Sequence, residues 1–204
     1  MKKTDWLRKN DPHGGKAVLD LWEMSDEASN KIDMGKAFFK TNMLDQAIEC
    51  FEEALQNEEQ VPDALFYLGV ISFKKREYEK AVSRFKKLLE IRTDSINIYN
   101  NLAISLEKCN LCKEAMLVYN TGLKITPSSK LLLGNRGVLK YKTGDYEGAM
   151  RDLRKSIKRK TGDLFLYHYL SLSLIKTARL DDAKEILEEA LSIAPTDTTI
   201  LNNL

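Results

Sequence analysis

Small and bulky positions recur along the chain at a fixed spacing of 34 residues. An alanine occupies the same place in every unit: Ala47, Ala81, Ala115, Ala149 and Ala183. Twelve residues before each alanine stands a small residue: Gly35, Gly69, Ala103, Gly137 and Ser171. Four residues after it stands a bulky one: Phe51, Phe85, Tyr119, Leu153 and Leu187. Small residues let two helix backbones approach closely and the bulky residue fills the space between helices, so the pattern predicts five helix pairs.

The pattern resembles the tetratricopeptide repeat (TPR), a 34-residue helix-turn-helix unit with a large residue, Leu-Gly, an aromatic residue, Ala, Phe and Pro at fixed offsets. Segments such as LFYLGVISFKKREYEKAVSRF and IYNNLAISLEKCNLCKEAMLVYNTGLKITP carry it. With the alanine as position 20, the predicted repeats span 28–61, 62–95, 96–129, 130–163 and 164–197. The resemblance implies an all-α fold, a right-handed superhelical solenoid of five repeats.

Both ends of the chain lie outside these repeats. Residues 1–27 are expected to form a tail and, at 16–24 (KAVLDLWEM), a short helix that caps the first repeat with Val18, Leu21 and Trp22 on one face. Residues 198–204 are expected to begin a sixth repeat or a capping helix. Because a solenoid normally closes with a polar-backed helix, the sequence suggests a fragment of a longer protein.

The resemblance also implies a binding surface. In this family the first helix of each repeat lines a concave groove, which usually holds an extended peptide or a helix of another protein. The expected peptide-binding positions are mostly apolar, aromatic or amide side chains: Phe66, Tyr67, Val70, Phe73, Asn100, Asn101, Ile104, Asn135, Val138, Tyr141, His168, Tyr169 and Leu172. Exposed apolar surface usually marks an interaction site, so we expect a ligand with apolar anchors. Packing between repeats is the alternative role for these side chains.

The polar groove residues narrow the expected ligand. An amide at the position of Asn101 and Asn135 can donate to and accept from a peptide backbone. The dicarboxylate clamp that some family members use for chaperone C-termini needs Lys and Asn in one repeat and cations two repeats later. The third repeat has Asn100 and Ile104 at those places, and the fifth has aromatic residues, so we do not expect chaperone-tail binding in the central repeats.

One cation falls at an inward-facing position. Arg136 stands where the other repeats have Met34, Leu68, Leu102 and Leu170. An unpaired charge there would be costly, and the resemblance implies that Arg136 pairs with Asp152 of the second helix.

Other charges recur at the surface. Position 13 of every repeat is a lysine: Lys40, Lys74, Lys108, Lys142 and Lys176. A cation there complements the negative end of the helix dipole, and a basic rail for an acidic ligand is the alternative. The run RDLRKSIKRK (151–160) is expected to be a solvated convex face, with RNA or an acidic partner as the alternative. No aromatic residue interleaves this run to stack on bases, so nucleic acid is not the expected partner.

Composition and motif content argue against several classes of protein. The chain is 43% apolar and 30% charged with a net charge of +2, and it has no run of eighteen apolar residues. We therefore predict no membrane span and, with three cysteines and no signal peptide, a cytoplasmic location. His13 and His168 are the only histidines, and motifs for zinc proteases, phosphate loops, nucleophile elbows and kinases are absent. Neither an enzyme nor a cofactor is expected.

Two cysteines, Cys109 and Cys112, fall in the predicted turn of the third repeat. A zinc site needs four ligands, and the sequence shows no second pair, so we expect a structural role. A redox-sensitive turn or a metal bridge between chains is the alternative.

The sequence therefore predicts a non-enzymatic interaction scaffold or adaptor with a protein or peptide partner. A self-assembling structural protein, a homo-oligomer whose terminal helix docks in the groove of a neighbour, is the second hypothesis. An RNA-associated module that uses 151–160 is the third.

Overall fold

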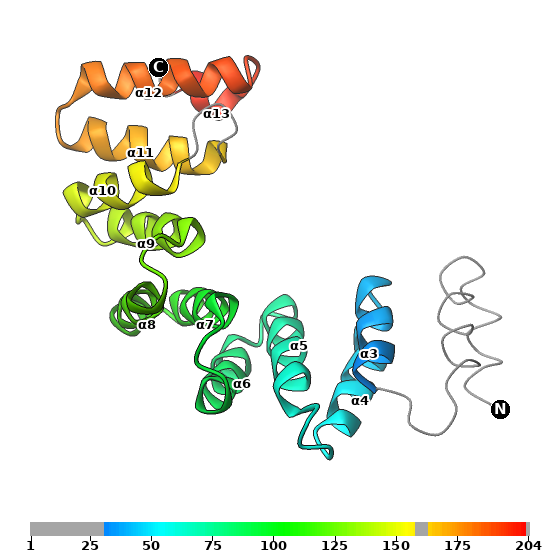
Figure 1. Cartoon of the computed structure of the whole chain (residues 1–204). Helices are drawn as coiled ribbons and strands as arrows, with labels where there is room; N and C mark the ends of the chain where they lie inside the picture. Colours follow the sequence, from blue (N-terminus) through cyan, green and yellow to red (C-terminus); the bar gives the residue numbers. More distant parts are fainter. Residues whose placement is uncertain (1–30, 158–162, 203–204) are drawn as a thin grey trace. The chain divides into compact units, whose positions relative to one another are not determined.

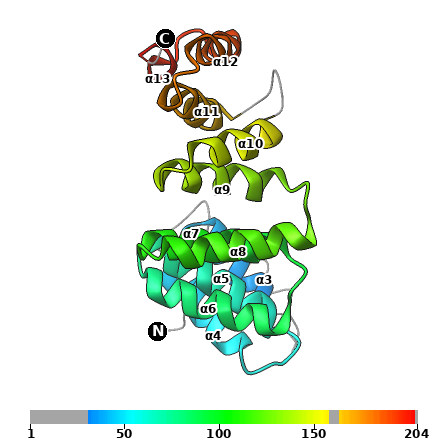
Figure 2. The same cartoon turned by 90° about the vertical axis from the view of Figure 1, so that its left-hand side faces the viewer.

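The structure is a computed structural model that describes residues 31–157 and 163–202 (Figures 1 and 2). The expected tail and capping helix at 1–27, and the last three residues of the 151–160 run, lie outside the described residues. Within the described ranges the regular structure is α-helical and contains no strand. In these ranges no helix is long and apolar enough to cross a membrane.

The helices come in pairs, and each first helix packs against the second helix of its pair. The first helices are α3 (Lys31–Lys40), α5 (Val61–Lys74), α7 (Ile96–Lys108), α9 (Lys130–Lys142) and α11 (Leu164–Lys176). The second helices are α4 (Leu44–Ala54), α6 (Tyr78–Ile91), α8 (Cys112–Ile125), α10 (Tyr146–Ser156) and α12 (Leu180–Ile193). A short helix, α13 (Thr198–Leu201), follows them.

The chain divides into two compact units, Met1–Thr93 and Asp94–Leu204. In the first unit, α5 packs against α4 and contacts α3. In the second unit, α8 packs on α9 and α10 packs on α11, while α9 contacts both α7 and α11. The first helices are therefore neighbours within each unit, and Figures 1 and 2 show α9 beside α10 and α11 beside α12.

The small and bulky positions pack as predicted. A Cβ atom on Gly35 would lie 2.5 Å from the Phe51 ring, and one on Gly137 would lie 2.7 Å from Leu153 Cγ, so no larger residue fits without movement. The recurring alanines are at most 3% exposed: Ala47, Ala81, Ala115, Ala149 and Ala183. The 34-residue pattern therefore marks the contact between the two helices of each pair.

The turn inside every pair uses one left-handed residue. It stands five residues before the recurring alanine, at Asn42, Arg76, Asn110, Gly144 and Ala178, with φ between 58° and 87°. The sequence pattern did not predict this, because only Gly144 belongs to the residue type that adopts a positive φ without cost.

Candidate functional site

Aromatic side chains form a row on the first helices of the second unit. The ring of Tyr169 on α11 lies 5.2 Å from that of Tyr141 on α9, 4.8 Å from that of Phe165 and 5.3 Å from that of His168. Phe165 is 51% exposed. Phe165 was not among the predicted binding residues, although it stands at the second position of its repeat, which the family uses in the groove. The row gives this face a partly exposed aromatic surface.

Three asparagines on the first helices α7 and α9 have different environments. Asn135 Nδ2 on α9 donates a hydrogen bond of 2.6 Å to Asn100 Oδ1 on α7, and Asn100 is buried. The pair therefore joins two neighbouring first helices. The half-buried Asn101 side chain makes no hydrogen bond to the described residues, so its amide is available to a ligand.

Two predicted groove residues are packed more deeply than expected. Val138 is 4% exposed and belongs to an apolar cluster with Met150 and Leu170, and Asn100 is 8% exposed. Their side chains fill space between repeats. These two residues therefore have the alternative role that the sequence left open, which is packing between repeats. Ile104, His168 and Leu172 are half-buried.

The first unit has an aromatic cluster of its own. Tyr67 stacks on the buried Phe51 ring at 5.0 Å and meets the Phe39 ring edge-to-face at 5.7 Å. Lys74 lies 4.5 Å above the Phe39 ring, and Lys36 lies 5.7 Å above the Tyr67 ring. The remaining predicted residues of this unit are also half-buried: Phe66, Val70 and Phe73. Much of this aromatic surface is already used in packing and cation–π contacts.

The predicted pairing of Arg136 with Asp152 is confirmed. Arg136 Nε and Nη2 each lie 2.7 Å from a carboxylate oxygen of Asp152, and Lys140 Nζ lies 2.8 Å from Oδ2. Arg136 Nη1 donates to Asn120 Oδ1 at 2.7 Å, which links α8 to this group. Burial raises the pKa of Asp152, but hydrogen bonds and charge from Arg136 and Lys140 outweigh burial, so the net pKa is lowered.

The position-13 lysines all lie in the last turn of a first helix. Two of them also have specific contacts, because Lys74 covers Phe39 and Lys142 Nζ lies 3.2 Å from Glu107 Oε2. Glu107 Oε1 accepts a hydrogen bond of 2.8 Å from the hydroxyl of Tyr119. Burial, and then the Glu107 charge, raise the pKa of Tyr119. The helix-terminus role therefore fits these lysines better than a continuous basic rail.

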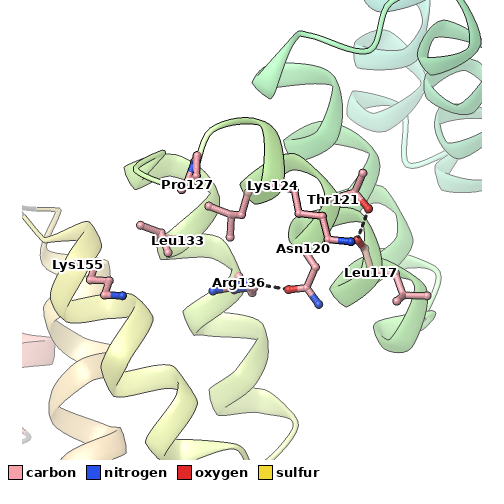
Figure 3. Close-up of a pocket in the computed structure, with 9 residues that line it drawn as sticks. Leu117, Asn120, Thr121, Lys124, Pro127, Leu133, Arg136 and Lys155 are labelled. Atoms are coloured by element: carbon pink, nitrogen blue, oxygen red, sulfur yellow. Dashed lines mark hydrogen bonds between the residues drawn. The ribbon is translucent and has the colours of Figure 1, made fainter.

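A pocket of about 530 Å³ lies between α8 and the pair α9–α10 (Figure 3). Its lining residues are Leu117, Asn120, Thr121, Leu123, Lys124, Pro127, Leu133, Arg136 and Lys155. Sequence reasoning missed this pocket, although one signal was present. Leu117 is apolar at a position that is polar or charged in the other repeats: Glu49, Ser83, Arg151 and Glu185.

The two turn cysteines occupy the predicted place. Cys109 follows the last residue of α7, Cys112 is the first residue of α8, and both have intermediate exposure and form no disulfide bond among the described residues. Among the described residues, no three His, Cys, Asp or Glu side chains are grouped to hold a metal ion.

The fold and the helix-pair contacts define an all-α repeat protein, a solenoid of helix-turn-helix units. The family model described as "Tetratricopeptide repeat" matches residues 32–96, and a second model of the same description matches 132–162 and 166–197. Together these matches cover more than half of the chain. The chain belongs to the tetratricopeptide repeat family, as the sequence pattern predicted.

Relatives share the repeat at low identity. A TPR repeat-containing protein of Methanocaldococcus jannaschii is 25% identical over 169 residues, which are 78% of this chain and 30% of the relative. Human tetratricopeptide repeat protein 13 is 22% identical over 172 residues, 82% of this chain and 20% of that protein. The chain therefore spans less than a third of the length of these relatives.

Solved structures support the same fold. YrrB, described as a TPR protein with an unusual peptide-binding site, superposes with a TM-score of 0.71 at 18% identity, covering 93% of this chain and 96% of YrrB. MamA of Desulfovibrio magneticus superposes with a TM-score of 0.74 at 16% identity, covering 86% of this chain and 99% of that structure. At this identity the likeness establishes the TPR fold.

Proposed function

We propose that this chain is a non-enzymatic interaction scaffold that binds a peptide or an amphipathic helix of another protein on the first helices of its second unit. TPR proteins are generally protein-interaction scaffolds. The observation that carries the proposal is the aromatic row of Phe165, Tyr169 and Tyr141, with the half-exposed Phe165 ring at its edge. We call this row, together with Asn101, the groove face.

The groove face offers two kinds of contact. An apolar side chain of a ligand would cover the exposed part of Phe165 and pack against Tyr169, and aromatic anchors of this kind commonly dominate binding energy. Asn101 can donate to and accept from one peptide unit of the ligand backbone. The rings therefore select an apolar anchor, and the amide fixes the backbone beside it.

The other predicted residues support the groove face from behind. Asn100 holds Asn135 across α7 and α9, and Val138 fills the core under Tyr141 and Tyr169. In this proposal they keep the groove face rigid, which lowers the entropy cost of binding. The first unit contributes less, because its Tyr67 and Phe39 rings are engaged by Phe51 and by two lysines.

The test begins with peptides selected from a displayed library on the purified chain and titrated by fluorescence anisotropy. We expect Phe165→Ala with Asn101→Ala to weaken the selected peptides about tenfold or more, since one aromatic anchor and one buried hydrogen bond are lost. Leu180→Ala is the matched control, because Leu180 is 63% exposed on α12, a second helix. Peptides that bind both variants with equal affinity would place the binding surface elsewhere.

A further inference from the structure

The charged side chains that line the pocket between α8 and the pair α9–α10 are all positive. Three of its lining residues are cations, Lys124, Arg136 and Lys155, and none is acidic. Arg136 is engaged by Asp152 and Asn120 at the base of the pocket. Lys124 and Lys155 are exposed, make no ion pair with the described residues, and lie on opposite sides of the opening (Figure 3). The pocket therefore presents uncompensated positive charge.

The same pocket is apolar between its charges. Leu133 and Leu123 are buried and form its floor, while Leu117 is 65% exposed, and Pro127 lines the pocket beyond the C-terminal end of α8. The equivalents of Leu117 in the other repeats are polar or charged and are also exposed to solvent. Packing among the described residues does not account for a leucine at such a position, whereas a partner's apolar side chain would.

Asn120 adds a directed donor to the pocket. Its Oδ1 accepts from Arg136 Nη1, so the orientation of the amide is fixed and its Nδ2 hydrogens remain for a ligand. Thr121 Oγ1 donates to the Leu117 carbonyl, which leaves this hydroxyl as a weaker partner for a ligand. The donors Lys124 Nζ, Lys155 Nζ and Asn120 Nδ2 together suit an acceptor-rich, negatively charged group.

We propose that this pocket is a second binding site, separate from the groove face, for an acidic segment of a partner protein in which an apolar side chain is flanked by carboxylates. The apolar side chain packs on the exposed Leu117 side chain. Flanking carboxylates meet Lys124 on α8 and Lys155 on α10, and a backbone or side-chain carbonyl accepts from Asn120. Charge complementarity between the two lysines and the carboxylates selects this ligand over a neutral apolar peptide.

Nucleic acid fits the pocket less well. Phosphates could meet the two lysines, but none of the lining residues is aromatic, so bases would have no ring to stack on. The exposed apolar Leu117 would also stay uncovered by a phosphate backbone. The described part of the 151–160 run agrees, because its exposed cations Arg151 and Arg154 have no aromatic neighbour in sequence.

The probe is a fluorescein-labelled peptide, EEDLFEEDE, titrated by anisotropy at low salt into the full chain. We expect Lys124→Gln with Lys155→Gln to weaken it about tenfold, and Leu117→Ser to weaken it severalfold. The matched control Lys113→Gln with Lys176→Gln removes the same charge from exposed lysines outside the pocket and is expected to leave the affinity within about twofold. Binding should weaken as salt is added.

Three further probes separate the outcomes. The peptides EEDSSEEDE and QQNLFQQNQ, which lack the apolar pair or the charges, are expected to bind at least several times more weakly. Equal weakening by both lysine pairs, or no binding of EEDLFEEDE, would overturn the site.

A nine-nucleotide uridine oligomer that binds more tightly than the peptide, and loses affinity in Lys124→Gln with Lys155→Gln, would assign the pocket to nucleic acid instead. Because Phe165→Ala with Asn101→Ala leaves this pocket intact, failure here and failure of the groove face are distinguishable.

Discussion

At the scale of single residues, Asp152 is a buried carboxylate that pairs with two cations in the second unit. Its side chain is 6% exposed and meets two cations, Arg136 at 18% and Lys140 at 17% exposure. Removing one partner of a buried ion pair leaves an uncompensated charge, which is more costly than the pair is favourable. The sequence could predict this pair because the cation stands at a position that is apolar in the other repeats. Lys140 was missed although a signal was present, because the other repeats have buried residues at its position: Phe38, Ser72, Leu106 and Leu174. Asn120 left no signal, because its position is polar or charged in every repeat.

Asp152→Asn is therefore expected to lower the free energy of unfolding by about 3–5 kcal/mol at pH 7. Asp182→Asn is the matched control, since Asp182 forms only exposed pairs with Arg154 and Arg179, and its expected cost is below about 1 kcal/mol. Urea denaturation followed by circular dichroism measures both. A similar small loss in the two variants would contradict the role of Asp152.

The same ion pair makes the stability of the fold depend on pH. The pKa of Asp152 is lower in the folded chain than in the unfolded chain. The contribution of Asp152 to the free energy of unfolding is therefore complete above the unfolded pKa and is lost as pH falls through the folded pKa. The stability difference between the native chain and Asp152→Asn should therefore shrink below about pH 4, the ordinary range for aspartate. A difference that stays constant from pH 6 to pH 3 would show that charge is not its cause.

At the scale of elements, the sequence predicted the helix pairs because one repeated contact shapes them. A small residue on the first helix faces a bulky residue on the second, as at Gly35 and Phe51, and this contact leaves a visible 34-residue pattern. The left-handed turn residue left no such pattern, because it is a backbone conformation that Asn, Arg and Ala adopt at a cost. The sequence also could not predict the burial of Val138 and Asn100, because the position of a residue in the repeat does not determine how closely two first helices approach.

Gly144→Ala tests the cost of that turn. Gly144 has φ +87°, and a Cβ atom there would meet nothing within 4 Å, so the substitution adds conformational cost without a steric clash. We expect a loss of about 1 kcal/mol in the free energy of unfolding. Ala178→Gly, at the equivalent turn with φ 58°, should have the opposite sign or no effect. Equal destabilisation by both substitutions would mean that the turn conformation does not control stability.

At the scale of the whole molecule, the second unit supplies two surfaces that share no residue. The groove face comes from the first helices α7, α9 and α11, whereas the pocket is lined mainly by α8, with two residues from α9 and one from α10. The family resemblance led sequence reasoning to the first surface. The second surface was missed because its lining residues come from three helices, and the family pattern assigns them no role.

This arrangement predicts that the two surfaces of the second unit can be occupied together. Saturating EEDLFEEDE should change the dissociation constant of a groove-selected peptide by less than about twofold, because the two ligands share no contact residue and sites without shared partners act nearly independently. Anisotropy of the groove peptide, labelled in a second colour, measures this directly. Phe165→Ala provides the reciprocal control, since it should weaken the groove peptide while EEDLFEEDE binds as before. Mutual exclusion of the two peptides would instead show that both occupy one surface, and the surface whose variants weaken both peptides would be the true site.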